Sequence, residues 1–176
     1  ILEHLKYLTP QKKTPIKNTK NKGEWTELLV FIKLLFEQKL FLSDEKLSAN
    51  TTYFKINKLA THNSELQFLI SNLSTIIVTK NIDNSEKEIN ISDVINNDSI
   101  NLLIAKIKEG KQTFTVPEFS IIQSTLGFDV VKLGNSNQKA DILLDIENDF
   151  LKKEHEGFGI KSYLGSKPTL LNASGN

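Results

Sequence analysis

The sequence lacks cysteine, arginine and methionine altogether among its 176 residues. Without cysteine there are no disulfides and no thiolate metal ligands, which fits a reducing cytoplasm. Methionine is missing even at position 1, so we expect the chain to be a fragment of a longer product. All 22 basic residues are lysine, a composition that suits an AT-rich genome.

A long hydrophobic run is also missing. The densest apolar stretch, residues 28–42, is interrupted by Lys33, Glu37 and Lys39, whereas a membrane span needs about 18 uninterrupted apolar residues. The net charge of +1 excludes the global positive field of many nucleic-acid binders, so DNA affinity would require a local cluster. With 39% hydrophobic and 24% charged residues, the chain has the composition of an ordinary globular domain.

Helical and strand-like patterns are mixed along the chain. Apolar residues recur at three- and four-residue spacing after Gly23, which predicts a helix from about Glu24 to Lys39. Further helices are expected at 99–108 and after Pro117, and strands at 50–80, 128–133, 140–146 and 157–164. Because some strands follow one another directly, we predict an α/β (α+β) domain with a mixed central sheet flanked by helices.

The stretch from Lys139 to Lys161 contains the strongest chemical pattern. Asp141 begins an apolar strand, and Lys161 ends a second short apolar run. An acid and a lysine on neighbouring strands are what a metal-dependent phosphodiesterase needs: the acid holds a divalent cation, and the lysine orients the attacking water. The same pair is also typical of a half-exposed ion pair, and spacing alone does not separate these interpretations.

Magnesium needs only one or two carboxylates and completes its octahedron with water and phosphate oxygens. Asp145 lies about 13 Å along the strand from Asp141 at about 3.3 Å per residue, so we do not expect it to share an ion with Asp141. The predicted metal-binding groups are Asp141, the strand backbone carbonyl of Ile160 and, through a water molecule, Glu27. The three histidines form no ligand motif, and no glycine-rich phosphate loop is present.

Three segments resemble the HpaII-like type II restriction endonucleases. They are KGEWTELLVFIKLL (22–35), KADILLDI (139–146) and GFGIKSYLGSKPTLLNASGN (157–176). The resemblance implies a PD-(D/E)xK nuclease core that cuts double-stranded DNA at CCGG with Mg²⁺ and leaves 5′-phosphates. It divides the chain into an N-terminal arm (1–22) and a catalytic domain (23–176), with a C-terminal part of the family pattern missing.

Carried over from the resemblance, Asp141 is the metal-binding acid, Lys161 the catalytic lysine and Glu27 the helix carboxylate, in GxxxE spacing from Gly23. Gly159 stands where the wider superfamily usually has a second acid. This departure leaves either one ion or an acid supplied from elsewhere, with Glu27 the leading candidate.

The resemblance also implies double-stranded DNA as partner, a homodimer acting on a palindrome, and a cognate DNA methyltransferase as genetic companion. Since arginine, the commonest guanine reader, is absent, readout would use lysine and amides. The candidate DNA contacts are Gln138, Lys139, Ser162, Ser166, Lys167, Thr169 and Asn172. Three alternatives remain open: a nuclease of this superfamily with another target, a DNA-binding relic without catalysis, and an unrelated α/β structural protein.

Overall fold

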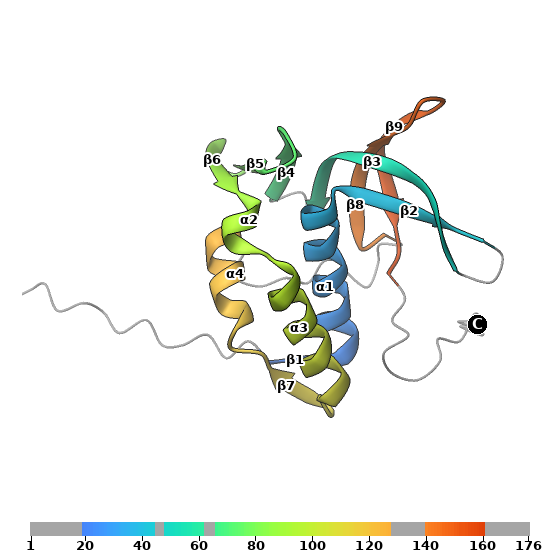
Figure 1. Ribbon diagram of the computed structural model, residues 1–176. Coiled ribbons are helices and arrows are strands. Elements are labelled where there is room, and N and C mark those ends of the chain that lie inside the picture. The colour runs from blue at the N-terminus through green and yellow to red at the C-terminus, as the bar shows by residue number, and fades with distance from the viewer. Residues whose placement is uncertain (1–18, 45–47, 62–65, 128–139, 161–176) are drawn as a thin grey trace, which may run out of the picture.

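The computed structural model describes residues 19–44, 48–61, 66–127 and 140–160, which form a seven-stranded sheet, a small two-stranded sheet and four helices (Figure 1). The strands of the large sheet lie in the order β6 (Ser85–Asn90), β5 (Thr75–Lys80), β4 (Leu66–Ile70), β3 (Ala49–Thr61), β8 (Ile142–Glu147) and β9 (Lys152–Phe158), and β2 (Lys39–Ser43) also pairs with β3. Its pairings are antiparallel. The predicted α+β class is confirmed.

The elements follow one another closely along the chain. In order they are β1 (Thr19–Asn21), α1 (Lys22–Glu37), β2 (Lys39–Ser43), β3 (Ala49–Thr61), β4 (Leu66–Ile70), β5 (Thr75–Lys80), β6 (Ser85–Asn90), α2 (Ile91–Val94), α3 (Asn97–Glu109), β7 (Thr113–Thr115), α4 (Phe119–Leu126), β8 (Ile142–Glu147) and β9 (Lys152–Phe158).

Helix α1 confirms the longest predicted helix, with both ends about two residues earlier than expected. Asn21 and Glu24 form a capping box: each side chain binds the backbone N–H of the other residue. The helix ends because Gln38 adopts the left-handed conformation (φ 56°), and Lys39 then starts β2. The strand Thr19–Asn21, which lies in the predicted arm, pairs with β7.

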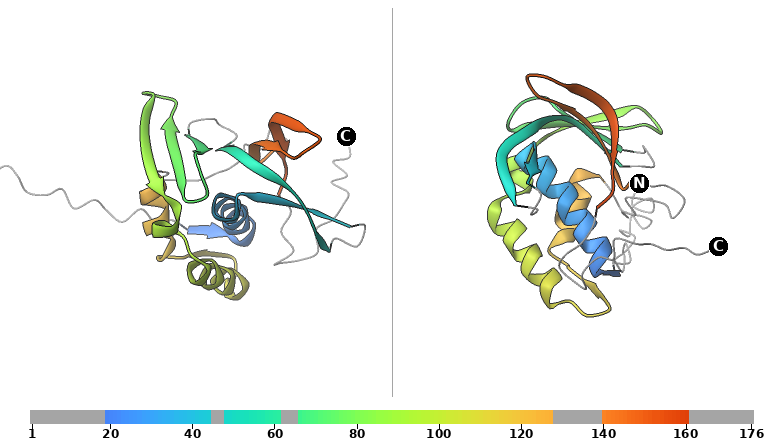
Figure 2. Two further views of the ribbon diagram at one scale, coloured as in Figure 1. Left: turned by 45° about the horizontal axis from the view of Figure 1, so that its top comes forward. Right: turned by 90° about the vertical axis from the view of Figure 1, so that its right-hand side faces the viewer.

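The core lies between the large sheet and the helices, which cover one of its faces (Figure 2). Phe31 of α1 packs edge-on against Phe68 of β4, with ring centroids 5.2 Å apart. Trp25 of α1 is fully buried, donates from Nε1 to the backbone oxygen of Phe114 at 3.1 Å, and packs edge-on against Phe119. These contacts fix α1 between the sheet and the β7–α4 segment.

The remaining helices and strands largely agree with the sequence predictions. Helices α3 and α4 and strands β3, β4 and β5 appear where apolar spacing predicted them. Strands β1, β2, β6 and β7 and the short α2 were not predicted. Strand β6 is an exposed edge strand in which only Ile89 is buried. Its sequence is therefore mostly polar and lacks the apolar alternation that indicates a strand. The strand predicted at 128–133 lies outside the described residues.

Candidate active site

The side chains of strand β8 alternate between a buried face and a half-buried face, as expected of a strand. Ile142, Leu144 and Ile146 are buried, whereas Leu143 and Asp145 are half-buried on the other face. The buried set packs in the core with α1. The face predicted to be apolar core is therefore confirmed.

The connection between β8 and β9 is shorter than predicted. The sequence placed a connection at 147–157 and a strand at 157–164, but β9 is Lys152–Phe158 and only four residues, 148–151, join it to β8. Asn148 closes this turn, because its Oδ1 accepts from the N–H groups of Phe150 (3.0 Å) and Leu151 (2.8 Å). Strand β9 escaped prediction because it is an edge strand rich in charged residues.

Asp141 lies directly before β8 and is tied to the end of β9 by two hydrogen bonds. Its backbone N–H donates to the oxygen of Phe158 at 2.8 Å. Its carboxylate Oδ2 accepts from the backbone N–H of Ile160 at 2.5 Å. The structure thus brings together Asp141 and Ile160, two of the three predicted metal ligands.

Two of the other predicted residues, Glu27 and Gly159, lie in the described part of the chain. Glu27 is half-buried near the start of α1, a different element from the β8–β9 hairpin that carries Asp141. Gly159 lies in the described chain between Phe158 and Ile160 and is exposed. Outside the described residues lie Lys161 and the candidate DNA contacts Gln138, Lys139, Ser162, Ser166, Lys167, Thr169 and Asn172.

Asp145 has a structural contact that the sequence did not reveal. Its Oδ1 accepts from the backbone N–H of His155 at 2.8 Å, and the His155 Nδ1 lies 3.8 Å away. His155 has φ 57°, and the β8–β9 register shifts between Leu144 and Ile146. The Asp145 carboxylate therefore stabilises a bulge in β9, which gives this acid a role separate from that of Asp141.

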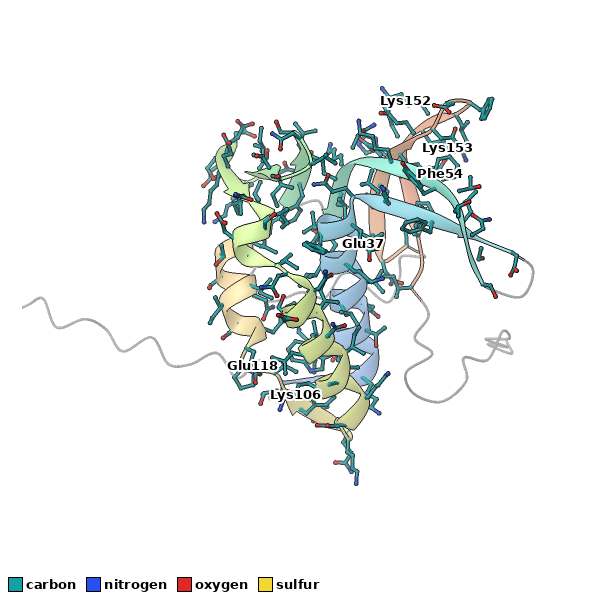
Figure 3. All side chains as sticks on the ribbon, in the orientation of Figure 1. Glu37, Phe54, Lys106, Glu118, Lys152 and Lys153 are labelled. Atoms are coloured by element: carbon teal, nitrogen blue, oxygen red, sulfur yellow. The ribbon has the colours of Figure 1, made fainter. Side chains whose placement is uncertain are left out.

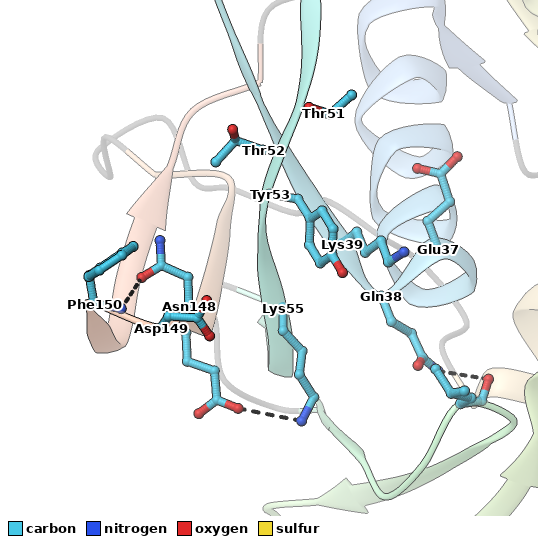
Figure 4. Close-up of a pocket in the computed structure, with 12 residues that line it drawn as sticks. Glu37, Gln38, Lys39, Thr51, Thr52, Tyr53, Lys55, Asn148, Asp149 and Phe150 are labelled. Atoms are coloured by element: carbon cyan, nitrogen blue, oxygen red, sulfur yellow. Dashed lines mark hydrogen bonds and ion pairs between the residues drawn. The ribbon is translucent and has the colours of Figure 1, made fainter.

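The far end of the β8–β9 hairpin borders a pocket of about 630 Å³ (Figure 4). Lys39 Nζ lies 4.4 Å above the Tyr53 ring, and Lys55 pairs with Glu147 at 3.4 Å. Hydrogen bonds from Asn57 and then Lys55 hold the pKa of Glu147 below its ordinary value. Glu147 lies six positions after Asp141, about 20 Å along the strand, so the pocket and the Asp141 group are distinct.

Charged side chains gather at the same end of the hairpin. Figure 3 shows Lys152 and Lys153 on β9 beside the turn, where they pair with Glu154 at 3.0 Å and Glu156 at 3.1 Å. These pairs are exposed and contribute little to stability. Among the described residues, no group of three or more His, Cys, Asp and Glu side chains could hold a metal ion, and no helix is long and apolar enough to cross a membrane.

A known protein family matches the part of the chain that contains Asp141 and the β8–β9 hairpin. The model of the HpaII restriction endonuclease family matches residues 21–176. The chain belongs to this family. The match includes both Asp141 and the end of β9, so the HpaII-type resemblance of the sequence is confirmed.

A curated relative shows the extent of the similarity. The type II restriction enzyme HpaII of Haemophilus parainfluenzae is 33% identical over 162 residues, which cover 88% of this chain and 43% of the relative. The chain therefore spans less than half the length of this HpaII-family relative. No solved structure matches the chain.

Proposed function

We propose that this chain carries the catalytic site of a type II restriction endonuclease, which hydrolyses double-stranded DNA at a short palindrome, CCGG, with Mg²⁺ and leaves 5′-phosphates. Membership of the HpaII restriction endonuclease family supports the reaction class. The observation that carries the assignment of the site is the hydrogen bond from Ile160 N–H to the Asp141 carboxylate. It holds the acid beside the residue that precedes Lys161 in the sequence.

The donor chemistry around Asp141 fits a magnesium ion. Mg²⁺ prefers oxygen ligands and commonly takes one or two carboxylates, with water and substrate phosphate in the other positions. The Asp141 Oδ1, the Ile160 carbonyl oxygen and Glu27 would hold it. The chemistry that a bound ion supplies is stabilisation of the negative charge that develops on the leaving 3′ oxygen.

The chain's own residues supply orientation. The Ile160 N–H fixes one carboxylate oxygen of Asp141 and leaves Oδ1 available to a ligand. Lys161 would position a water for in-line attack on the phosphate. Because Gly159 cannot supply a second carboxylate, the remaining acid would be Glu27 from α1.

Recognition would come from residues that flank the two site strands. Lys139 and Lys167 would contact phosphate, and the polar side chains of Gln138, Ser162, Ser166, Thr169 and Asn172 would contact phosphate or base edges. A palindromic target would be matched by a homodimer with twofold symmetry. Such an enzyme would act in the cytoplasm beside a cognate DNA methyltransferase that protects the host sequence.

Plasmid cleavage tests this proposal. The full chain is incubated with a plasmid that carries CCGG sites, with Mg²⁺ and with EDTA, beside Lys161→Ala. Lys153→Ala is the matched control, because it removes an exposed lysine near the opposite end of the hairpin. We expect discrete fragments that map to CCGG, lost with EDTA and with Lys161→Ala but kept with Lys153→Ala. Discrete fragments at another sequence would overturn the target and keep the reaction.

One observation favours a second candidate, a DNA-binding protein that has lost catalysis. By the HpaII-type resemblance, Gly159 stands where the wider nuclease superfamily usually has a second acid. Intact plasmid together with a shifted CCGG duplex in a gel would favour this binder over the enzyme. Replacing Gly159 with Glu would then be expected to restore metal-dependent cleavage.

A further inference from the structure

Gly157 of β9 makes an unusually close approach to Ala140. A Cβ atom added to Gly157 would lie 2.8 Å from the Ala140 Cβ and 3.8 Å from the Leu143 Cδ2. The second distance is an ordinary contact, but carbon atoms pack best at about 3.5–4.0 Å. A glycine within a strand often marks a place where another backbone comes close. Gly157 is therefore required here by the space that Ala140 occupies.

The contact between Gly157 and Ala140 lies directly beside the two hydrogen bonds that hold Asp141 against the end of β9. Ala140 is bonded to Asp141, whose N–H and carboxylate bind the backbone of Phe158 and Ile160. Gly157 precedes Phe158 in β9 and pairs with Leu143 in β8. The three contacts hold the chain at 140–141 against the chain at 157–160, so a change in one spacing alters the others.

The size of the displacement can be estimated from the contact distance. To move from 2.8 Å to about 3.5 Å, the two methyl carbons of a Gly157→Ala variant would have to separate by about 0.7 Å. Both carbons are bonded directly to backbone, so the backbone has to move. Catalytic groups need placement within about 0.5 Å, and a misplacement of about 1 Å can cost a rate factor of about 100.

We infer that Gly157 is a positioning residue for the metal-binding carboxylate: its lack of a side chain lets Ala140 approach β9, and this approach places Asp141 in reach of the Ile160 N–H. The inference rests on the proposed function for the role of Asp141. The close contact itself is a property of the fold. Gly157 would act through Asp141 and has no side chain that could take part in the chemistry.

Exchanging the methyl group between the two sides of the contact tests the inference. Gly157→Ala introduces the clash, Ala140→Gly removes the methyl group that it meets, and the double variant carries the methyl on the opposite side. Ala140→Val, which enlarges the contact from the β8 side, serves as a second variant should Gly157→Ala fold poorly. Thermal unfolding of each protein establishes that it is folded before any activity is compared.

Three measurements are made on each full-length variant. They are kcat and KM for cleavage of a CCGG duplex, the affinity for Ca²⁺ by calorimetry, and hydrogen exchange at the Ile160 amide by NMR. For Gly157→Ala and for Ala140→Val we expect kcat to fall about 10- to 100-fold with little change in KM, weaker Ca²⁺ binding and faster exchange at Ile160. The double variant should recover most of each loss.

Two results would overturn the inference. One is a folded Gly157→Ala protein with unchanged kcat and unchanged Ile160 exchange. The other is a double variant as impaired as Gly157→Ala, because the clash would then not be the cause. If the unaltered protein fails to cut DNA, the proposed function fails, while exchange at Ile160 across the four variants still decides whether Gly157 positions Asp141.

Discussion

The Asp141 carboxylate accepts a hydrogen bond from the backbone N–H of Ile160 at 2.5 Å. Four residues further along, Asp145 accepts from the N–H of His155 at 2.8 Å. Both aspartates thus bind backbone N–H groups of the neighbouring segment: Asp141 at the end of the β8–β9 pairing and Asp145 at the bulge that interrupts it. Their chemistry is the same, but only Asp141 lies beside the segment that leads to Lys161.

Replacing Asp141 with asparagine should separate charge from structure. The Asn Oδ1 can still accept from the Ile160 N–H, so the fold should be retained, whereas the negative charge for a metal ion is lost. We expect DNA cleavage by D141N to fall at least about 100-fold, with a melting temperature close to that of the unaltered protein. Cleavage at the original rate would remove Asp141 from the proposed mechanism.

Asp145→Ala should show the opposite pattern. It leaves the His155 N–H without its acceptor in a bulge that requires a left-handed residue. We expect a loss of about 1 kcal/mol in the free energy of unfolding, since this N–H lies on an exposed edge strand where water can replace the acceptor. Urea denaturation followed by circular dichroism measures the loss. Cleavage by the folded fraction should persist, and its abolition would show that Asp145 belongs to the site.

Trp25→Phe tests how α1 is held against the rest of the protein. The variant loses the hydrogen bond from Nε1 to Phe114 and part of the edge-on contact with Phe119. We expect the free energy of unfolding to fall by about 1–3 kcal/mol. Because Trp25 is the sole tryptophan and is fully buried, its fluorescence should shift to longer wavelength when the unaltered protein unfolds. An unshifted spectrum would contradict this burial.

The Glu147 pair predicts acid sensitivity at the pocket end of the hairpin. Hydrogen bonds from Asn57 and Lys55 hold the pKa of Glu147 below its ordinary value of 4.5. A lowered folded-state pKa means that the stabilisation is present above pH 4.5 and is lost as the pH falls through the folded pKa. Glu147→Gln should therefore reduce the loss of stability below pH 4.5. The melting temperatures of both proteins between pH 3 and pH 7 measure this, and identical profiles would contradict it.

Local patterns in the sequence carried enough information for the main helices and for the inner strands. Leu28, Leu29 and Ile32 recur at helical spacing and are buried in α1, because one face of that helix packs on the sheet. In β8 the apolar set Ile142, Leu144 and Ile146 alternates with a face that carries Asp145, and this alternation predicted which face is core. The edge strands β6 and β9 were not predicted from such patterns, because the residues of an edge strand do not need to be apolar.

The sequence by itself determined the α+β class, the family and the choice of Asp141 as the candidate acid, because periodicity and motif are written in consecutive residues. The tertiary structure decided that β9 starts at Lys152, that Asp145 stabilises a bulge, and that Gly157 admits Ala140 at close range. These features depend on register between two strands. Register is set by turn geometry and by the match between the apolar faces of two strands. Strand β9 is mostly charged and exposed, so its spacing did not reveal how it pairs with β8.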